Sequence, residues 1–324
     1  MAEATLWLAG WSDSEDEDFR AACMEAGVEA RVARVGPLGP TVGTRRHRLR
    51  TWPAYLRQAR RGVRWPGPVV AWDPVAGSLA ALARHRHGRL VVLNPLLEPG
   101  APTHRQRLVL RGARRADRVL FFSRSAAREA GELGIPADRV GFVPLGVRAR
   151  RGRPRPPGGH LLAVGRERRD WETLARAAQA LDVEVRVVGP AAVPGPLRLL
   201  PAVDRPRLLE LMDEAAAVLV PLTDDRRTAG QLAVLDAFSV GRGVVATRGP
   251  GTEDYVTSQT GALVPAGDAD ALRAALELAV SPAAAAAWGE AALEAARGRL
   301  SLTRFVAAVD GEARGPSGVV AVGH

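Results

Sequence analysis

Short apolar runs recur along the first half of the chain, with stretches of helical spacing between them. The runs are TLWLAG (5–10), EARVARVG (29–36), VVAWDP (69–74), LVVLNPLL (90–97), RVLFFS (118–123) and GFVPLGV (141–147). Strands that are buried on both faces of a parallel sheet are typically continuous apolar runs of this length. The alternation therefore predicts a parallel sheet with helices on both faces.

The second half repeats this pattern after a segment that lacks it. RARRGRPRPPGG (148–159) is rich in Pro, Gly and Arg and has no apolar period, which is typical of a linker. The next strand-like runs are LLAVG (161–165), VEVRVVG (183–189), LRLLPAV (197–203), AVLVPLT (217–223), VVAT (244–247) and TGALVP (260–265). Helices are expected at 268–280, 283–298 and 301–310. The fold class is therefore α/β, with two doubly wound domains facing each other across a cleft.

The repeated pattern predicts three parts of the chain. Residues 1–157 form the first domain with its linker, and residues 158–300 form the second domain. Residues 301–324 are expected to be a C-terminal helix that returns towards the first domain, followed by a tail. Ligands of such sheets bind beyond the carboxyl ends of the strands.

Composition places the chain among globular proteins and narrows its setting. Hydrophobic residues make up 47% and charged residues 25%. No apolar run approaches the roughly 20 residues of a membrane span. The first residues lack the basic segment of a secretory signal, and Cys23 has no second cysteine with which to form an intramolecular disulfide. These features predict a cytoplasmic protein.

The charges are unusual in kind and in distribution. All 45 basic residues are arginine, so a Walker-A lysine and a Schiff-base lysine are both excluded. Residues 1–157 hold 28 arginines against 14 acidic residues, whereas residues 158–324 hold 17 against 21. This difference suggests two domains with different partners.

Residues 44–65 form the most basic segment, with eight arginines and no acidic residue. Five apolar side chains fall at helical spacing: Leu49, Trp52, Leu56, Ala59 and Val63. Core packing is the usual explanation of such a stripe, and Pro53 should limit the first turn or divide the helix. The basic flanks also suit an anionic membrane or acceptor, which predicts a peripheral contact at the inner membrane surface. Nucleic acid is disfavoured, because no set of stacking aromatic residues is interleaved.

Two segments of the second half carry candidate chemistry. In TAGQLAVLDAFSVGRGVVAT (228–247), small residues precede an apolar helix and leave its first N–H groups open to an anion. Asp236 inside that helix suits either a solvated face or a ribose diol. In GRERRD (165–170), arginines follow a strand and precede a helix capped by Asp170, so they either grip a diphosphate or solvate a loop. No metal-ligand spacing is present, and no metal is expected.

These segments resemble those of a known family. LLAVGRERRDWETLARA, TAGQLAVLDAFSVGRGVVATRGPGTEDYV and TGALVPAGDADALRAAL are similar, in order and spacing, to the donor-site segments of retaining family 4 glycosyltransferases. The resemblance covers most of residues 141–300. The first half matches clearly only in ADRVLFFSRSAAREAGELGIPADRVGFVPLGV. The resemblance implies the GT-B fold, with two Rossmann-like domains, the donor on the second and the acceptor on the first.

The resemblance also implies roles for individual residues of the second half. Arg166 would bind the diphosphate and Arg169 would supply a second positive charge. Backbone N–H groups of Gly230, Gln231 and Leu232 would contact the phosphates. The family's two glutamates, eight positions apart, fall on Thr228 and Asp236. Asp236 would thus keep the ribose contact, whereas Thr228 lacks the carboxylate that touches the donor sugar, and Gln231 would take over part of that contact.

In the first half, the resemblance implies fewer site residues. The family's glycine pair after the first strand is reduced to Gly10-Trp11-Ser12, so Gly10 and Ser12 are the expected donor contacts there. Asn94 is the nearest candidate for a histidine often found in the family's first domain. Asn94, Thr228 and Gln231 are therefore the candidate catalytic residues.

The activity implied is transfer of a sugar, with retention and without a metal or further cofactor. The donor would be a nucleoside-diphosphate sugar, and the acceptor a small molecule, a lipid-linked compound or a glycan. Two alternatives remain. One is a non-catalytic binding or assembly partner with the same fold, which the loss of the carboxylate at Thr228 favours. The other is a nucleotide-sugar epimerase or hydrolase, which would need an acid/base pair that the sequence does not reveal.

Overall fold

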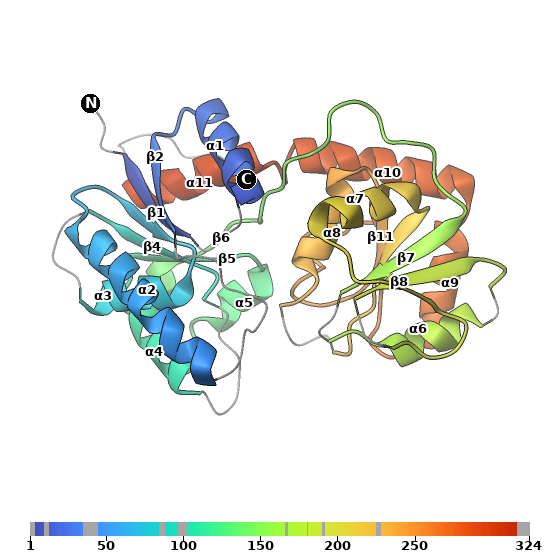
Figure 1. Ribbon diagram of the computed structural model, residues 1–324, viewed down its shortest axis with the longest axis horizontal. Coiled ribbons are helices and arrows are strands. Elements are labelled where there is room, and N and C mark those ends of the chain that lie inside the picture. Colours follow the sequence, from blue (N-terminus) through green and yellow to red (C-terminus); the bar gives the residue numbers. More distant parts are fainter. Residues whose placement is uncertain are drawn as a thin grey trace. The chain divides into compact units, whose positions relative to one another are not determined.

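The computed structural model describes residues 4–9, 13–34, 45–83, 88–95, 103–165, 168–179, 181–189, 192–224 and 228–315. The chain forms two compact units, shown in Figure 1. The first is Met1–Val143 together with Leu302–His324, and the second is Pro144–Ser301. The expected linker, residues 148–159, thus lies within the second unit.

The described strands of the first unit form one parallel sheet in the order β2-β1-β3-β4-β5-β6. They are β1 (Thr5–Ala9), β2 (Ala30–Arg34), β3 (Val69–Ala71), β4 (Leu90–Leu93), β5 (Arg118–Phe121) and β6 (Val140–Phe142). All five pairings are parallel, and β1 lies between β2 and β3, with Leu6 opposite both Arg31 and Val69. The strand order reverses between β1 and β3, where doubly wound sheets bind ligands.

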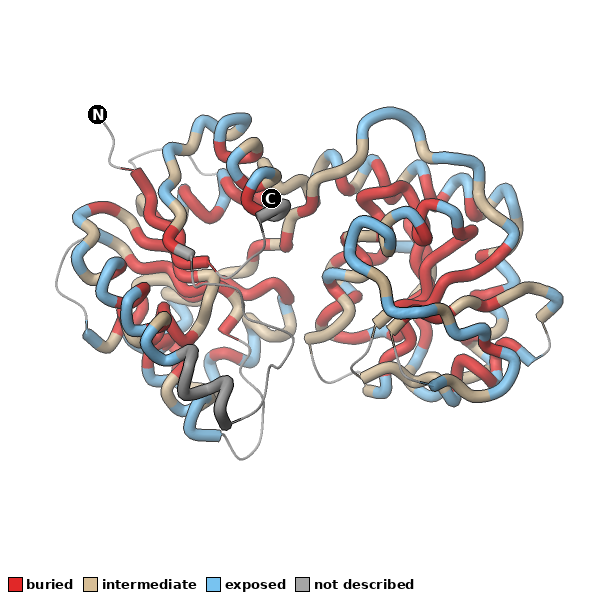
Figure 2. Tube along the Cα trace, viewed as in Figure 1, coloured by how far each residue is buried: buried red, intermediate tan, exposed pale blue. Residues whose placement is uncertain are grey.

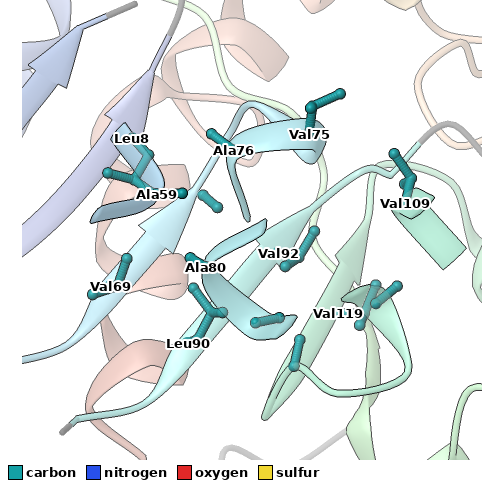
Figure 3. Packing of buried hydrophobic residues seen from close by; sticks show 14 of the residues in the cluster. Leu8, Ala59, Val69, Val75, Ala76, Ala80, Leu90, Val92, Val109 and Val119 are labelled. Atoms are coloured by element: carbon teal, nitrogen blue, oxygen red, sulfur yellow. The ribbon is translucent and has the colours of Figure 1, made fainter. Parts of the chain in front are cut away.

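Helices cover both faces of this sheet. The elements are α1 (Asp13–Glu25), α2 (Arg45–Arg64), α3 (Pro74–Leu82), α4 (His104–Ala113), α5 (Arg124–Glu129), the 3₁₀ turn η1 (Ala137–Arg139) and α11 (Leu302–Arg314). Helices α2, α3 and α4 pack in series on one face, and α1 packs with α11 on the other (Figure 1). The core under α2 and α3 interleaves strand residues such as Leu8, Val69 and Val92 with Ala59 and Ala80 (Figure 3).

The C-terminal helix α11 is fastened to the first unit by buried polar contacts. Thr5 in β1 donates a hydrogen bond to Asp310, and Arg314 forms an ion pair with the same aspartate at 2.6 Å. Phe305, Val306 and Val309 of this helix are buried. The helix therefore completes the core of the first sheet, although it follows the second unit in the chain.

The apolar stripe expected in α2 packs differently from the prediction. Trp52 and Leu56 are 41% and 49% exposed, whereas Tyr55, Gln58 and Ala59 face the core. Gln58 fits there because its amide donates to the carbonyls of Ala9 and Ala33 at 3.1 and 2.7 Å. The prediction that Trp52 and Leu56 are core residues was wrong. Pro53 does not divide the segment, which is one helix.

The second unit repeats the design with a different strand order, β12-β11-β10-β7-β8-β9. Its strands are β7 (His160–Val164), β8 (Glu184–Val188), β9 (Arg198–Leu200), β10 (Ala217–Val220), β11 (Gly243–Thr247) and β12 (Gly261–Val264). Its helices are α6 (Trp171–Ala178), α7 (Arg205–Glu214), α8 (Gln231–Ser239), α9 (Ala269–Ala279) and α10 (Pro282–Arg297). The order reverses between β7 and β10, the switch point of a Rossmann sheet. Figure 2 shows the buried strands at the centre of each unit.

Candidate functional site

At the carboxyl edge of the second sheet, buried hydrogen bonds join the segments that follow β10 and β11. The N–H of Leu222, just beyond β10, donates to the hydroxyl of Thr247 at the end of β11, at 2.8 Å. The hydroxyl of Thr252 donates to the carbonyl of Thr247 at 2.7 Å and thereby fixes the following turn. These buried contacts hold the ends of β10 and β11 together at the carboxyl edge of the sheet.

Helix α8 begins beside these contacts. Gly230 is the N-cap residue, with φ of 86°, and no side chain among the described residues caps the helix. The first bond within the helix runs from the N–H of Val234 to the carbonyl of Gly230, and the first turn holds no acidic residue. A helix start with this arrangement attracts an anion through the N–H groups of its first turn and its dipole.

Two glycines allow the chain to reach this position. A Cβ at Gly230 would lie 2.9 Å from Val220 Cγ1, and its φ disfavours other residues. A Cβ at Gly251 would lie 1.9 Å from the carbonyl oxygen of Ala229. The turn at 249–252 therefore packs directly against the backbone that leads into α8.

Arg169 brings a positive charge to the end of β7. Its Nε donates to the carbonyl of Val164 at 2.7 Å, and the guanidinium lies so close to Gly165 that a Cβ there would be 2.4 Å from it. Burial lowers the pKa of Arg169 to about 10, so the side chain is still charged at neutral pH. A partly buried guanidinium is a strong partner for a phosphate.

The loop that carries Arg169 is hydrogen-bonded to the segment that follows β10. The N–H of Thr223 donates to the carbonyl of Arg168, and that of Asp170 donates to the carbonyl of Pro221. Arg168 adopts a φ of 54° and forms an ion pair with Asp224 at 3.2 Å. Asp170 also caps α6, as predicted, by accepting from the N–H of Thr173. Arg166 lies outside the described residues.

The side chains of Gln231 and Asp236 already have protein partners. Gln231 is buried and hydrogen-bonds the hydroxyl of Tyr255, which also accepts from the N–H of Leu145 at 3.0 Å. Burial raises the pKa of Tyr255, so the phenol stays protonated. Asp236 accepts from Arg205 of α7 at 2.6 Å.

In the first unit, the carboxyl edge of the sheet is lined by side chains. Trp72 packs edge-on against Phe122 and Phe305, with ring centroids 5.9 and 5.2 Å away. Asp73 caps α3 by accepting from two backbone N–H groups, and burial raises the pKa of its carboxyl group. Asn94 follows β4 with a φ of 38°, a left-handed conformation that asparagine tolerates better than most residues. Gly10 and Ser12 lie outside the described residues.

Comparisons with known proteins identify the family. A model described as "Glycosyl transferase 4-like domain" matches residues 3–146, and one described as "Glycosyl transferases group 1" matches residues 149–281. The chain belongs to the group 1, family 4-like glycosyltransferases. No curated protein sequence matches it on sequence alone.

Solved structures show that this glycosyltransferase has the GT-B fold. Sucrose-phosphate synthase from Thermosynechococcus elongatus is 17% identical, with 96% of this chain and 98% of that chain covered and a TM-score of 0.72. HepE from Anabaena, solved with UDP, is 15% identical, with 95% and 98% covered and a TM-score of 0.70. HepE has also been solved with UDP-glucose, and that structure is 16% identical, with the same coverage and a TM-score of 0.65.

The structure of the glycosyltransferase brings together part of the predicted site. Arg169, Gly230, Gln231 and Leu232 all lie at the carboxyl edge of the second sheet, and the Leu232 side chain is 69% exposed. Thr228 precedes this helix start and is half-buried. Asn94 lies at the corresponding edge of the sheet in the first unit.

Sequence reasoning missed four residues that shape this edge. Arg205 and Tyr255 hold Asp236 and Gln231, while Thr247 and Thr252 hold the strand ends. Only the glycines of RGPGTEDYV hinted at a tight turn there. Among the described residues, no group of three or more His, Cys, Asp or Glu side chains is placed to hold a metal ion.

Proposed function

We propose that the protein transfers a hexose from a UDP-sugar to an acceptor hydroxyl, with retention and without a bound metal. One observation carries this proposal: the uncapped start of α8 and the guanidinium of Arg169 lie at the same switch point. HepE, a structural neighbour that is solved with UDP-glucose, supports the choice of donor.

The proposed chemistry follows from the diphosphate as leaving group. The bond between the sugar's anomeric carbon and the β-phosphate oxygen breaks, and the acceptor oxygen bonds to that carbon. The acceptor proton passes to the departing phosphate. Charge accumulates on the diphosphate, where the N–H groups of Gly230, Gln231 and Leu232 and the arginines at 166 and 169 would stabilise it. Asp236 would bind the ribose.

Two measurements test this function. Calorimetry with UDP, GDP and dTDP gives the nucleotide, and release of UDP from UDP-glucose, with and without acceptors, gives the activity. We expect UDP to bind most tightly and UDP-glucose to be hydrolysed slowly when no acceptor is present. If no nucleoside diphosphate binds at millimolar concentration, the proposed donor site is wrong.

A second candidate is a non-catalytic partner that binds the nucleotide sugar without transferring it. Two observations favour it: Thr228 supplies no carboxylate, and the carboxylate of Asp236 is paired with Arg205. Tight UDP binding without hydrolysis or transfer for any donor would support this candidate. Strong transferase activity created by Thr228→Glu would support it as well, because the fold would then lack only that carboxylate.

We also propose a catalytic contribution of Gln231 that its role in packing does not explain. Gln231→Ala and Tyr255→Phe both break the hydrogen bond between these side chains. If Gln231 also contacts the donor sugar, only Gln231→Ala should lower kcat more than it weakens UDP binding. Equal effects of the two variants on kcat would make Gln231 a packing residue.

We further propose that α2 brings the enzyme to an anionic membrane. Its exposed side chains include Trp52 and Leu56 beside Arg57, Arg60 and Arg64. No helix among the described residues is long and apolar enough to cross a membrane. Apolar anchors next to arginines favour binding at the surface of an anionic bilayer.

Co-sedimentation with vesicles tests this contact. The wild type should bind anionic vesicles at low salt and dissociate from them at high salt. The double variant Trp52→Gln with Leu56→Gln should bind them more weakly at low salt. Leu278→Gln is the matched control, because Leu278 is 50% exposed on α9 of the other unit. Equal binding to neutral vesicles, or none to either kind, would refute the proposal.

A further inference from the structure

A groove in the first unit lies between α5 and the edge strand β6. It has a volume of about 570 Å³, and its lining residues are Arg124, Ala127, Arg128, Gly131, Ala137, Val140, Gly141 and Phe142. This volume is in the range of small-molecule sites, roughly 300–1,000 Å³. None of the residues assigned to the donor site lines it.

Two arginines supply the charge of this groove. The guanidinium of Arg124 lies over the ring of Phe142, 4.4 Å from its centroid. Arg128 lies one helical turn further along α5, and its Nε donates to the carbonyl of Arg124 at 3.4 Å. Stacking on an aromatic ring restricts a guanidinium, so less conformational freedom is lost when it binds a ligand.

The other walls are small and uncharged. No aspartate or glutamate is among the lining residues, although Glu129, Glu132 and Asp138 lie close by in sequence. The small alanine side chains and the glycines, which have none, leave the space open between the two arginines and β6. The groove therefore combines a cationic wall with an apolar one, which suits a compact organic anion.

The groove runs along the edge strand β6, and one end of it reaches the carboxyl edge of the first sheet. Arg124 begins α5 shortly after β5 ends, and Phe142 is the last residue of β6. Both residues thus lie at the carboxyl edge of the first sheet, as Asn94 does after β4. In a doubly wound sheet, ligands approach this edge.

We propose that this groove binds the phosphate or carboxylate group of a small organic anion, and that this anion is the acceptor substrate. The second statement rests on the proposed glycosyltransfer. Arg124 and Arg128 grip the anionic group, while Phe142 and the alanines contact the carbon skeleton beside it.

Calorimetry with the donor site saturated by UDP tests the groove. The probes are glucose 6-phosphate, glucuronate and neutral glucose, which distinguish phosphate from carboxylate and both from an uncharged sugar. We expect at least one of the two anions to bind and glucose not to bind. Failure of both anions to bind the wild type overturns the proposal.

Variants locate the binding. Arg124→Gln with Arg128→Gln should lower the affinity for the anion at least about tenfold, because charge-assisted hydrogen bonds are lost. Arg107→Gln with Arg111→Gln is the matched control, because it removes two exposed arginines at the same spacing on α4. Ala127→Trp keeps both charges, fills the groove and should weaken binding as much as the first pair does.

The outcomes separate this inference from the donor site. If both double variants lose anion affinity equally, the attraction is non-specific. If Arg124→Gln with Arg128→Gln loses no anion affinity, the anion binds elsewhere. Either result overturns the proposal. UDP affinity should stay unchanged in every variant. If the wild type fails to bind UDP, the proposed function fails, and the same probes without UDP still test the groove.

Discussion

The carboxyl edges of the two sheets differ in what they present to a ligand: backbone groups in the second unit and side chains in the first. In the described part of the second unit's edge, backbone groups predominate: Gly165, Gly189 and Gly230 all have positive φ, and a Cβ at Gly189 would lie 2.2 Å from the carbonyl oxygen of Gly165. In the first unit, the edge is lined by the side chains of residues such as Trp72 and Asp73. Within the residues that the structure describes, one edge thus presents N–H groups, and the other presents rings and a carboxylate.

This difference matches the two kinds of substrate that a glycosyltransferase must bind. A diphosphate is common to all nucleotide-sugar donors, and backbone N–H groups bind it whatever sugar it carries. Acceptors vary, and side chains can vary with them. Backbone sites also require glycine at fixed positions, so their sequences keep a recognisable spacing. That is why the resemblance was specific in the second half and weak in the first.

The largest effect is expected from filling the backbone contact at Gly251. Gly251→Ala would force a methyl group against the carbonyl of Ala229 and displace the start of α8. We expect the free energy of unfolding to fall by about 3 kcal/mol and UDP affinity to fall at least about 100-fold. Urea unfolding and calorimetry measure the two effects.

Gly311→Ala is the control for this substitution. Gly311 lies within α11, and no atom comes within 4 Å of the added Cβ, so stability and UDP affinity should not fall. If Gly251→Ala is destabilised but binds UDP as tightly as the wild type, the backbone before α8 does not define the donor site.

Arg169→Met sharpens the comparison, because Arg169 is the one side chain that we assign to the diphosphate within the described part of the second edge. Loss of charge-assisted hydrogen bonds should weaken the binding free energy of UDP by about 1.5–3 kcal/mol, which lowers its affinity roughly 10- to 150-fold. Uridine, which has no diphosphate, should bind as before. Equal weakening of UDP and uridine would show that Arg169 only supports the loop, and Arg176→Met on the exposed face of α6 controls for lost charge.

The sequence predicted the buried strands and the start of α8 well, because parallel strands and an uncapped glycine helix start are local patterns. It failed where a partner far along the chain decides the outcome. Nothing near Asp236 indicates that Arg205 would hold it. The prediction of which face of α2 is buried was wrong, because Gln58 donates hydrogen bonds to two carbonyls that are distant in sequence and therefore lies inside. Trp52 and Leu56 consequently face outward.

Asp236 tests whether a side chain reads the nucleoside at an otherwise backbone-built edge. If Asp236 binds the ribose, Asp236→Asn should weaken UDP about tenfold and remove the preference for UDP over 2′,3′-dideoxy-UDP. Arg205→Ala leaves the carboxylate in place and should keep that preference. Should both variants keep it, Asp236 serves only the ion pair with α7.

The smallest effect concerns the side-chain edge of the first unit and depends on pH. Burial raises the pKa of Asp73 above its ordinary value of 3.8, while its hydrogen bonds from Ala76 and Val75 and the charge of Arg105 act against the shift. The folded protein then holds this proton more tightly than the unfolded chain, so the contribution of Asp73 to stability is present at low pH. It is lost as the pH rises from about 3.8 through the folded-state pKa.

Asp73→Asn keeps an oxygen for the two N–H groups that cap α3 and removes the buried charge. We therefore expect the stability of Asp73→Asn relative to the wild type to rise as the pH rises from about 3.8 through the folded-state pKa of Asp73, and to level off above that pKa, as measured by urea unfolding. Asp117→Asn is a suitable control, because Asp117 also accepts from a backbone N–H, that of Leu90, at 2.7 Å. A difference for Asp73→Asn that falls with rising pH would show that the carboxylate is stabilised as an anion, and that this edge too is organised around bound charge.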